Sequence, residues 1–198
     1  MLKRVLIYGV AFGSLSASMV LINFFNQLYM HRNALSAIPT LANIFILCFG
    51  VYFLVKQIIL ESTENVQAES NRTLKEKPSK NAVVESKNKP LTLGKILFAS
   101  LTMSLIAALC NVAAYKHIQT NQPERFQHFK AMQIGAIDAY IAKDVTLTTI
   151  VKKQEKRQLA VSNLEEKLKV GTYASFEIQM YLSLGMIITL LVYIAKKK

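Results

Sequence analysis

Histidine and cysteine, the side chains best suited to bind a transition metal or to act as a nucleophile, are few in this chain and far apart. The histidines are His31, His117 and His128, and none has a carboxylate or a cysteine at the spacing of a metal site. Cys48 and Cys110 both fall inside apolar stretches, where small side chains commonly pack between helices. No CxxC pair occurs, and two cysteines so placed do not make the disulfide framework of a secreted domain. We therefore expect neither a metal nor a cofactor.

The carboxylates are also poorly placed for acid–base catalysis. Asp138 and Asp144 flank the end of an expected helix, and Glu165 and Glu166 lie on a charged helix face. Carboxylates in such places are usually solvated instead of being paired around a reacting atom. The chain has no GxxxxGK[ST], HExxH, GxSxG or GxGxxG motif. These patterns favour a protein without enzymatic activity.

Four long apolar stretches, each flanked by lysine or arginine, predict the elements that carry these residues. Hydrophobic residues make up 52% of the 198 residues and are gathered into blocks separated by polar segments. A helix needs ~20 apolar residues to cross the hydrocarbon core, where only helices and closed barrels satisfy their backbone. We predict an all-α polytopic membrane protein with four transmembrane helices and a helical extramembrane segment between spans three and four. The spans are placed at residues 5–25, 37–60, 96–115 and 177–195.

The formal net charge of +12 is explained by membrane topology. Eight basic residues lie at span ends with no acid nearby: Lys3, Arg4, Arg32, Lys56, Lys95, Lys196, Lys197 and Lys198. Basic residues in short loops are retained on the cytoplasmic side. All of these except Arg32 fall on one side, so we expect both termini in the cytoplasm and residues 116–176 outside. No basic stripe with interleaved aromatic residues indicates nucleic-acid binding.

Two transmembrane hairpins, residues 1–60 and 91–198, are expected to be joined by a polar cytoplasmic linker at residues 61–90. This linker is rich in Glu, Lys, Ser and Asn, so we expect it to be solvated and mobile. The first span also fits a signal peptide, with small residues near Ala17 where cleavage could occur. Because the apolar run continues to Phe25 and reaches spanning length, we favour a retained span over a cleaved one.

Small and polar side chains predict where the spans pack. Gly9, Gly13 and Ala17 recur at intervals of four and share one face, which another helix can approach closely. We favour packing within the chain, with a homo-oligomer contact or chance as alternatives. A second helix-packing face is expected on the third span, at Ser100, Ser104, Ala108 and Asn111. The Asn111 amide needs a partner there, and an interhelical hydrogen bond is favoured over a ligand site.

The outer segment, residues 116–176, is expected to contain two helices. Pro123 marks the start of the first. Its large apolar residues gather on one side as a candidate interaction strip: Phe126, Phe129, Ile137, Tyr140 and Ile141. Ser162 to Glu165 matches a capping box that would open the second helix, with a bend near Gly171. We favour packing of the strip on the seam of that helix at Val161, Leu164 and Leu168, with the membrane surface or a partner as alternatives.

The last span is expected to begin near Glu177, with the Glu177 side chain facing water or lipid headgroups. The middle of every span is then uncharged, and its polar atoms are hydroxyls such as those of Ser104 and Thr189. Coupled transport usually requires an ionisable residue or a broken helix at mid-membrane, so we disfavour it. A passive pore built by oligomerisation remains open.

Three short segments carry a resemblance to a known family: Leu91 to Lys95, Asn121 to Arg125, and Ser162 to Glu166 before a last span that ends in lysines. In this layout the chain resembles an uncharacterised bacterial four-span membrane family, domain of unknown function 4199. The resemblance implies a bacterial inner membrane and supplies no activity, cofactor or catalytic residue.

Together these patterns predict a non-catalytic accessory or scaffold subunit that acts through protein interaction. Its expected partners are the lipid bilayer and either another membrane protein or a second copy of the chain. The alternative is a passive channel or transporter subunit. The two differ in their interior, because a pore needs a continuous polar path whereas a scaffold has dry apolar packing.

Overall fold

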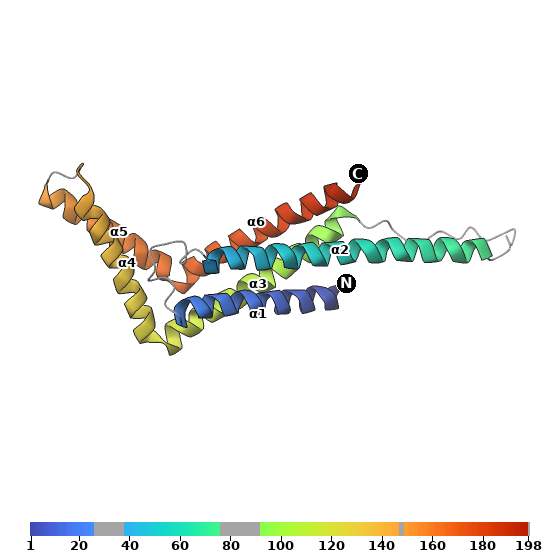
Figure 1. Cartoon of the computed structure of the whole chain (residues 1–198), viewed down its shortest axis with the longest axis horizontal. Coiled ribbons are helices and arrows are strands. Elements are labelled where there is room, and N and C mark those ends of the chain that lie inside the picture. Colours follow the sequence, from blue (N-terminus) through green and yellow to red (C-terminus); the bar gives the residue numbers. More distant parts are fainter. Residues whose placement is uncertain (26–37, 76–91, 147–148, 198) are drawn as a thin grey trace.

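The computed structural model describes residues 1–25, 38–75, 92–146 and 149–197, with side chains at 1–25, 40–63, 92–146 and 149–196. These residues form only helices: α1 (Leu2–Phe25), α2 (Ile38–Lys75), α3 (Leu93–Asn121), α4 (Pro123–Lys143), α5 (Ile150–Leu168) and α6 (Val170–Lys197) (Figure 1). The predicted all-α class is confirmed.

Four of the helices are long and apolar enough to cross a membrane: Leu2–Phe25, Thr40–Thr63, Leu93–Asn121 and Val170–Lys196. They form a bundle in which successive spans alternate in direction, so the two termini lie at the same end (Figure 1). Their outer faces leave large apolar side chains such as Phe45, Phe98 and Leu191 exposed, as expected where lipid covers a helix. The chain is a multi-pass integral membrane protein.

The half of the bundle nearest the termini is filled with apolar side chains. α3 packs against α1, α2 and α6. The most deeply buried residues here come from α1, α2 and α3: Val5, Leu47, Val51, Leu54, Val55, Ile96 and Met103. At the same end, Tyr8 donates a hydrogen bond to Gln57 Oε1 (2.7 Å), and Arg4 pairs with Glu61. This half is therefore a packed core that fixes α1 against α2.

α2 does not end with its apolar stretch but continues to Lys75, into the segment that was predicted to be a linker. The extension is the part of α2 that projects past the other spans in Figure 1. Residues 61–75 contain neither proline nor glycine and many good helix formers, so a helix that begins in the membrane can propagate into water. Residues 76–91, which make up the rest of the predicted linker, lie outside the described residues.

At the opposite end, α4 and α5 form a helical hairpin that leans away from the bundle (Figure 1). α4 begins at Pro123, as predicted. The predicted start of the second helix at Ser162 was wrong, because α5 already begins at Ile150, where the Thr149 hydroxyl caps the Lys152 N–H. The bend is at Lys169, whose extended backbone (φ −63°, ψ 138°) separates α5 from α6, and not at Gly171.

Three ion pairs fasten α5 along α4. They join Lys130 to Glu165 (2.8 Å), Asp138 to Arg157 (2.6 Å) and Asp144 to Lys156 (2.7 Å). Hydrogen bonds from Lys156 and from Thr146 lower the pKa of Asp144 to about 2. The hydrogen bond from Arg157 likewise lowers the pKa of Asp138. The hairpin is thus held largely by charge along its length.

Candidate functional site

α3 and α6 meet along two matching stripes of side chains. On α3 the stripe is the predicted one, and Ser100, Ser104, Ala108 and Asn111 are all fully buried. On α6 it repeats every four residues, at Tyr173, Glu177, Tyr181, Gly185 and Thr189. Residues four apart share a helix face, so each stripe lies on one side of its helix. Since α3 and α6 are antiparallel, the start of one stripe faces the end of the other.

Three residue pairs along the two stripes are in direct contact. Thr189 donates a hydrogen bond to Ser100 Oγ (2.7 Å), and Gly185 leaves room for the Ser104 side chain. Towards the hairpin, Asn111 Nδ2 donates to Tyr181 Oη (2.6 Å). The Asn111 amide therefore takes part in the interhelical hydrogen bond that the sequence favoured.

Gly9 and Gly13 lie against another part of α3. A Cβ atom on Gly9 would lie 3.0 Å from Ile106 Cβ, and one on Gly13 would lie 3.0 Å from Ala107 Cα and 2.9 Å from Cys110 Sγ. Ala17, one turn further, is half-buried at the edge of the aromatic cluster described below. Both glycines are thus placed in contacts within the chain.

A connected set of polar side chains ties α1, α3 and α6 together near the hairpin end. The Ser16 and Tyr181 hydroxyls lie 2.5 Å apart, and Asn111 Nδ2 donates to Glu177 Oε2 at 3.2 Å as well as to Tyr181. Glu177 is only 8% exposed. The expectation that Glu177 faces water or headgroups was therefore wrong. α6 begins at Val170, which puts Glu177 ~2 turns inside the helix and on the face turned towards α3.

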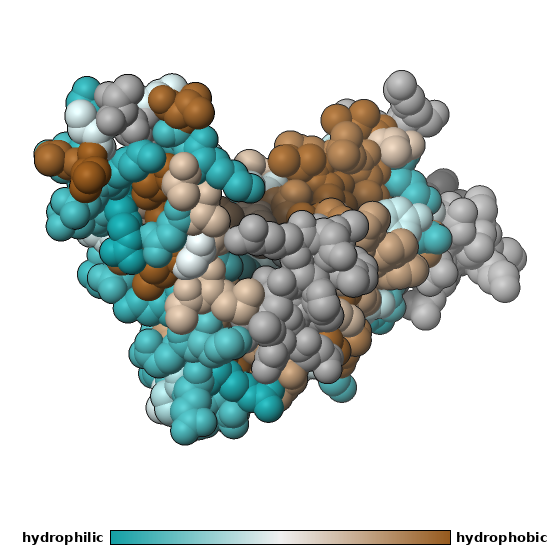
Figure 2. Space-filling view, turned by 60° about the vertical axis from the view of Figure 1, so that its left-hand side comes forward, coloured by the Kyte–Doolittle hydropathy of each residue, from teal (hydrophilic) through white to brown (hydrophobic). Residues whose placement is uncertain are grey.

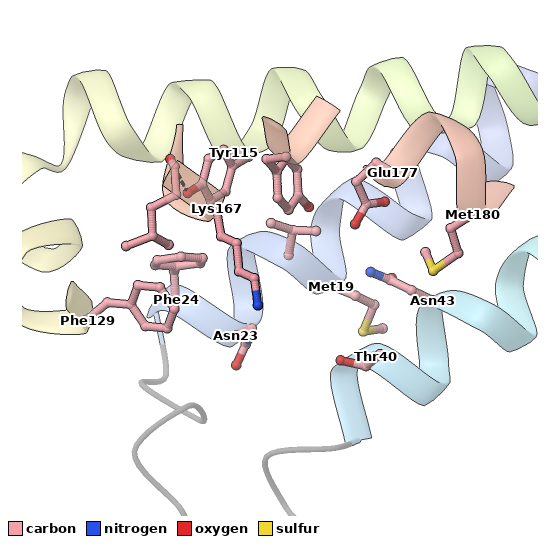
Figure 3. A pocket seen from close by; sticks show the side chains of 13 residues that line it. Met19, Asn23, Phe24, Thr40, Asn43, Tyr115, Phe129, Lys167, Glu177 and Met180 are labelled. Atoms are coloured by element: carbon pink, nitrogen blue, oxygen red, sulfur yellow. Dashed lines mark hydrogen bonds between the residues drawn. The ribbon is translucent and has the colours of Figure 1, made fainter. Parts of the chain in front are cut away.

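Beside this network is a cavity of about 250 Å³. Glu177, Lys167 and Asn43 point into it from α6, α5 and α2, and Asn23 of α1 lies at its lower edge in Figure 3. Among the described residues, the buried Oδ1 atoms of Asn23 and Asn43 have no hydrogen-bond partner. Aromatic and methionine side chains complete the wall: Met19, Phe24, Tyr115, Phe129, Tyr173 and Met180. The wall of the cavity therefore combines an acidic, a basic, two amide and several aromatic side chains.

Tyr115 holds the junction between hairpin and bundle in place. Its hydroxyl donates to the Leu168 carbonyl oxygen (2.9 Å), and its ring stacks on Tyr173 with centroids 4.0 Å apart. These contacts fix the break between α5 and α6, and with it the positions of Lys167 and Glu177.

The candidate interaction strip is divided between two places. Phe126 packs edge-on against Tyr115 (5.8 Å between centroids), and Phe129 packs on Phe24 (5.3 Å), so both seat α4 on the end of the bundle. Ile137, Tyr140 and Ile141 lie further out and line a shallow hollow beside Lys156 and Ala160 of α5. The strip is therefore not one continuous surface. Of the predicted seam, Leu168 joins the bundle cluster, while Val161 and Leu164 are half-buried.

Sequence reasoning missed Ser16, Asn23, Asn43, Glu177 and Tyr181 as a group. The signal that could have found the α6 members is their spacing of four, which matches the spacing on α3. No comparable pattern marks Asn23 or Asn43, whose meeting depends on how α1 and α2 cross.

Fold and site together define the class of the protein: a four-span integral membrane protein with a helical hairpin outside the spans and a cavity where the hairpin meets the bundle. Comparison with protein-family models, with curated proteins and with solved structures finds no match. The role of the protein is therefore argued from its own geometry.

Proposed function

We propose that this protein is a non-catalytic accessory or scaffold subunit that acts through protein interaction and docks its partner on the α4–α5 hairpin. The observation that carries the proposal is a tip patch of three apolar side chains: Val145, Ile150 and Val151, which are 91%, 77% and 63% exposed. Exposed apolar groups gathered outside a membrane commonly mark an interaction site. Figure 2 shows such groups amid the hydrophilic surface of the hairpin.

The charged residues beside the tip patch indicate the surface charge expected of the partner. Lys143, Lys152 and Lys153 adjoin the patch in sequence, whereas Lys156 and Arg157 are already paired with aspartates. An apolar centre with a basic rim is complementary to an apolar protein surface with an acidic rim. The partner we propose is a membrane or extracytoplasmic protein with such a surface.

We further propose a bacterial inner membrane, with both termini and the α2 extension in the cytoplasm and the hairpin outside. Support comes from four basic residues at the end of the bundle that carries the termini: Lys3, Arg4, Lys95 and Lys196. The resemblance to the bacterial four-span family agrees with this location.

A passive channel or transporter subunit is the second candidate, and the buried Glu177 beside the cavity is what favours it. The apolar core around Leu54, Ile96 and Met103 argues against a pore, because these side chains pack together there and the buried hydroxyls of Ser100 and Thr189 bond to each other. The scaffold role is therefore preferred.

The test is a variant with Val145, Ile150 and Val151 all replaced by Ser. Leu159→Ser is the matched control, because Leu159 is also an exposed apolar residue of the hairpin. Wild type and control, purified in mild detergent, should carry a stoichiometric partner that raises the native mass. The triple variant should melt as the parent does and lack that partner. A wild-type chain that purifies alone, or a partner retained by the triple variant, would contradict docking at the tip.

A further inference from the structure

We propose that the cavity beside Glu177 binds a small zwitterion with a primary ammonium group and a phosphate group, with Glu177 receiving the ammonium and Lys167 the phosphate. The inference concerns a different surface from the hairpin tip and does not depend on the docking of a partner there. It rests on the charges, the amide groups and the walls of the cavity.

The carboxylate of Glu177 lacks a cationic partner within the described part of the chain. It accepts hydrogen bonds from Asn111 and Tyr173, but none of the ion pairs formed there includes Glu177. A carboxylate removed from water is costly unless positive charge and donors surround it. An ammonium group entering the cavity would provide both.

The amide groups of the cavity wall are also incompletely hydrogen-bonded. The Oδ1 atoms of Asn23 and Asn43 are buried acceptors without a donor among the described residues. A primary ammonium has three N–H donors and no acceptor. Glu177 is the acidic acceptor that such a group would meet in the cavity, and the two amides belong to the same wall. Water could satisfy the same atoms, and the experiment below separates the two occupants.

The positive charge of Lys167 disfavours a ligand that is only a cation. Its side chain points into the space that Glu177 also faces (Figure 3). A ligand with only positive charge is repelled by Lys167, and one with only negative charge is repelled by Glu177. A zwitterion matches both walls at once. Phosphate suits a lysine, which binds it as a point charge.

The size and position of the cavity further limit the class of ligand. A volume of about 250 Å³ is below the ~300–1,000 Å³ of drug-sized sites, so the cavity suits a headgroup and not an acyl chain. The rings of Phe24, Tyr115 and Tyr173 belong to the same wall, and aromatic rings are compatible with an ammonium group nearby. The cavity lies where the bundle meets the hairpin, and Figure 2 shows the surface hollowed between these two parts. The zwitterion can therefore come from a lipid headgroup or from a free solute.

The experiment uses the full chain in nanodiscs that contain only phosphatidylglycerol, with O-phosphoethanolamine as the probe. Titration calorimetry should find saturable binding that is weaker for ethylammonium and for ethyl phosphate, each of which carries one charge. Glu177→Gln should weaken binding of the zwitterion by about tenfold or more, as expected for loss of a charged hydrogen bond.

Lys167→Gln gives a readout that a structural role would not. It should weaken binding of O-phosphoethanolamine and strengthen that of ethylammonium, because the repelling charge is gone. Lys169→Gln is the matched control, since Lys169 lies two residues on and pairs with Glu166 outside the cavity. Wild-type affinities are expected for this control.

Adding phosphatidylethanolamine to the nanodiscs separates the two sources. Competition with the soluble probe identifies a lipid headgroup, and unchanged probe binding identifies a free solute. The proposal is overturned if wild type shows no saturable binding, which leaves water as the occupant. It is also overturned if a folded Glu177→Gln variant binds as wild type does. If Glu177→Gln does not fold, an unchanged ligand preference in Lys167→Gln overturns it.

Discussion

Asn111 supports two neighbours at once, because its Nδ2 group donates to both Glu177 and Tyr181. Asn111→Ala would leave the buried carboxyl of Glu177 with fewer donors. We expect a loss of about 1–3 kcal/mol in the free energy of unfolding, the usual cost of an unsatisfied buried polar group. Thermal melting in detergent measures it. Asn121→Ala, at the exposed end of α3, is the control and should stay within about 0.5 kcal/mol of the parent. Equal melting of the two variants would mean that water replaces Asn111 at no cost.

Gly13 is a second residue whose role can be measured alone. A side chain there meets Ala107 Cα at 3.0 Å, which is backbone and cannot turn aside. Gly13→Leu should lower stability by about 1–3 kcal/mol through overpacking. Gly94→Leu is the matched control in α3, since nothing lies within 4 Å of the position that its Cβ would take. If both variants melt as wild type does, α1 does not pack on α3 through Gly13.

At the scale of single residues, the sequence predicts the packing positions of small residues better than those of charged residues. Gly13 and Ser104 could be assigned to packing because only small side chains allow helices to approach, whatever the partner. Glu177 could not be assigned to the interior. Its side chain faces the interior because α6 starts at Val170 and because Asn111 of α3 donates a hydrogen bond to it. The start of α6 and the position of Asn111 both depend on tertiary contacts.

The α4–α5 hairpin is attached to the bundle by aromatic packing, and its two helices are joined to each other by ion pairs. Phe126 is buried between Tyr115 and Phe129 at the end of the bundle. Phe126→Ala should therefore cost about 3–5 kcal/mol, as for other large core truncations. Leu159→Ala removes an exposed side chain of the same hairpin and should cost at most about 0.5 kcal/mol. Denaturant or thermal unfolding compares them. Similar stabilities would show that α4 is not anchored at Phe126.

The ion pairs predict how the hairpin responds to acid. The pKa of Asp144 is about 2 in the folded chain, below the ~3.9 of an unfolded chain. Its contribution is therefore fully present above about pH 4 and is lost as the pH falls towards about 2. Asp144→Asn should lower the melting temperature at about pH 5 and much less at about pH 2. Glu155→Gln, another acidic residue of the hairpin, is the control. An equal effect of Asp144→Asn at both pH values would contradict the pairing with Lys156.

Element boundaries were predicted where a local signal suffices. Pro123 fixes the start of α4 because it is tolerated only in a first helical turn or outside a helix. Ser162 matched a capping box, but the same residue pattern can occur on the exposed face of a continuous helix, as it does in α5. The α2 extension was missed because its composition resembles a solvated linker, whereas its growth follows from the membrane helix that precedes it.

At the scale of the whole molecule, hydrophobic length alone predicts four spans, because a helix satisfies the polar backbone groups of each long apolar stretch within the hydrocarbon. The way in which the hairpin meets the bundle was not predicted, since it depends on Tyr115 bonding to Leu168, far along the chain. The result is a membrane bundle with an apolar core near the termini and, beneath the hairpin, an aromatic cluster beside the Asn111–Glu177–Tyr181 network.

The sidedness of the molecule is the central claim, because docking of an extracytoplasmic partner at the tip requires the hairpin to lie outside. Single cysteines at Ser70 in the α2 extension and at Ala160 in α5 test it in a background without Cys48 and Cys110. In intact cells an impermeant thiol reagent should label the cysteine at 160 and not the one at 70, and both should react once the membrane is opened. Labelling of position 70 alone, or of both positions in intact cells, would contradict it.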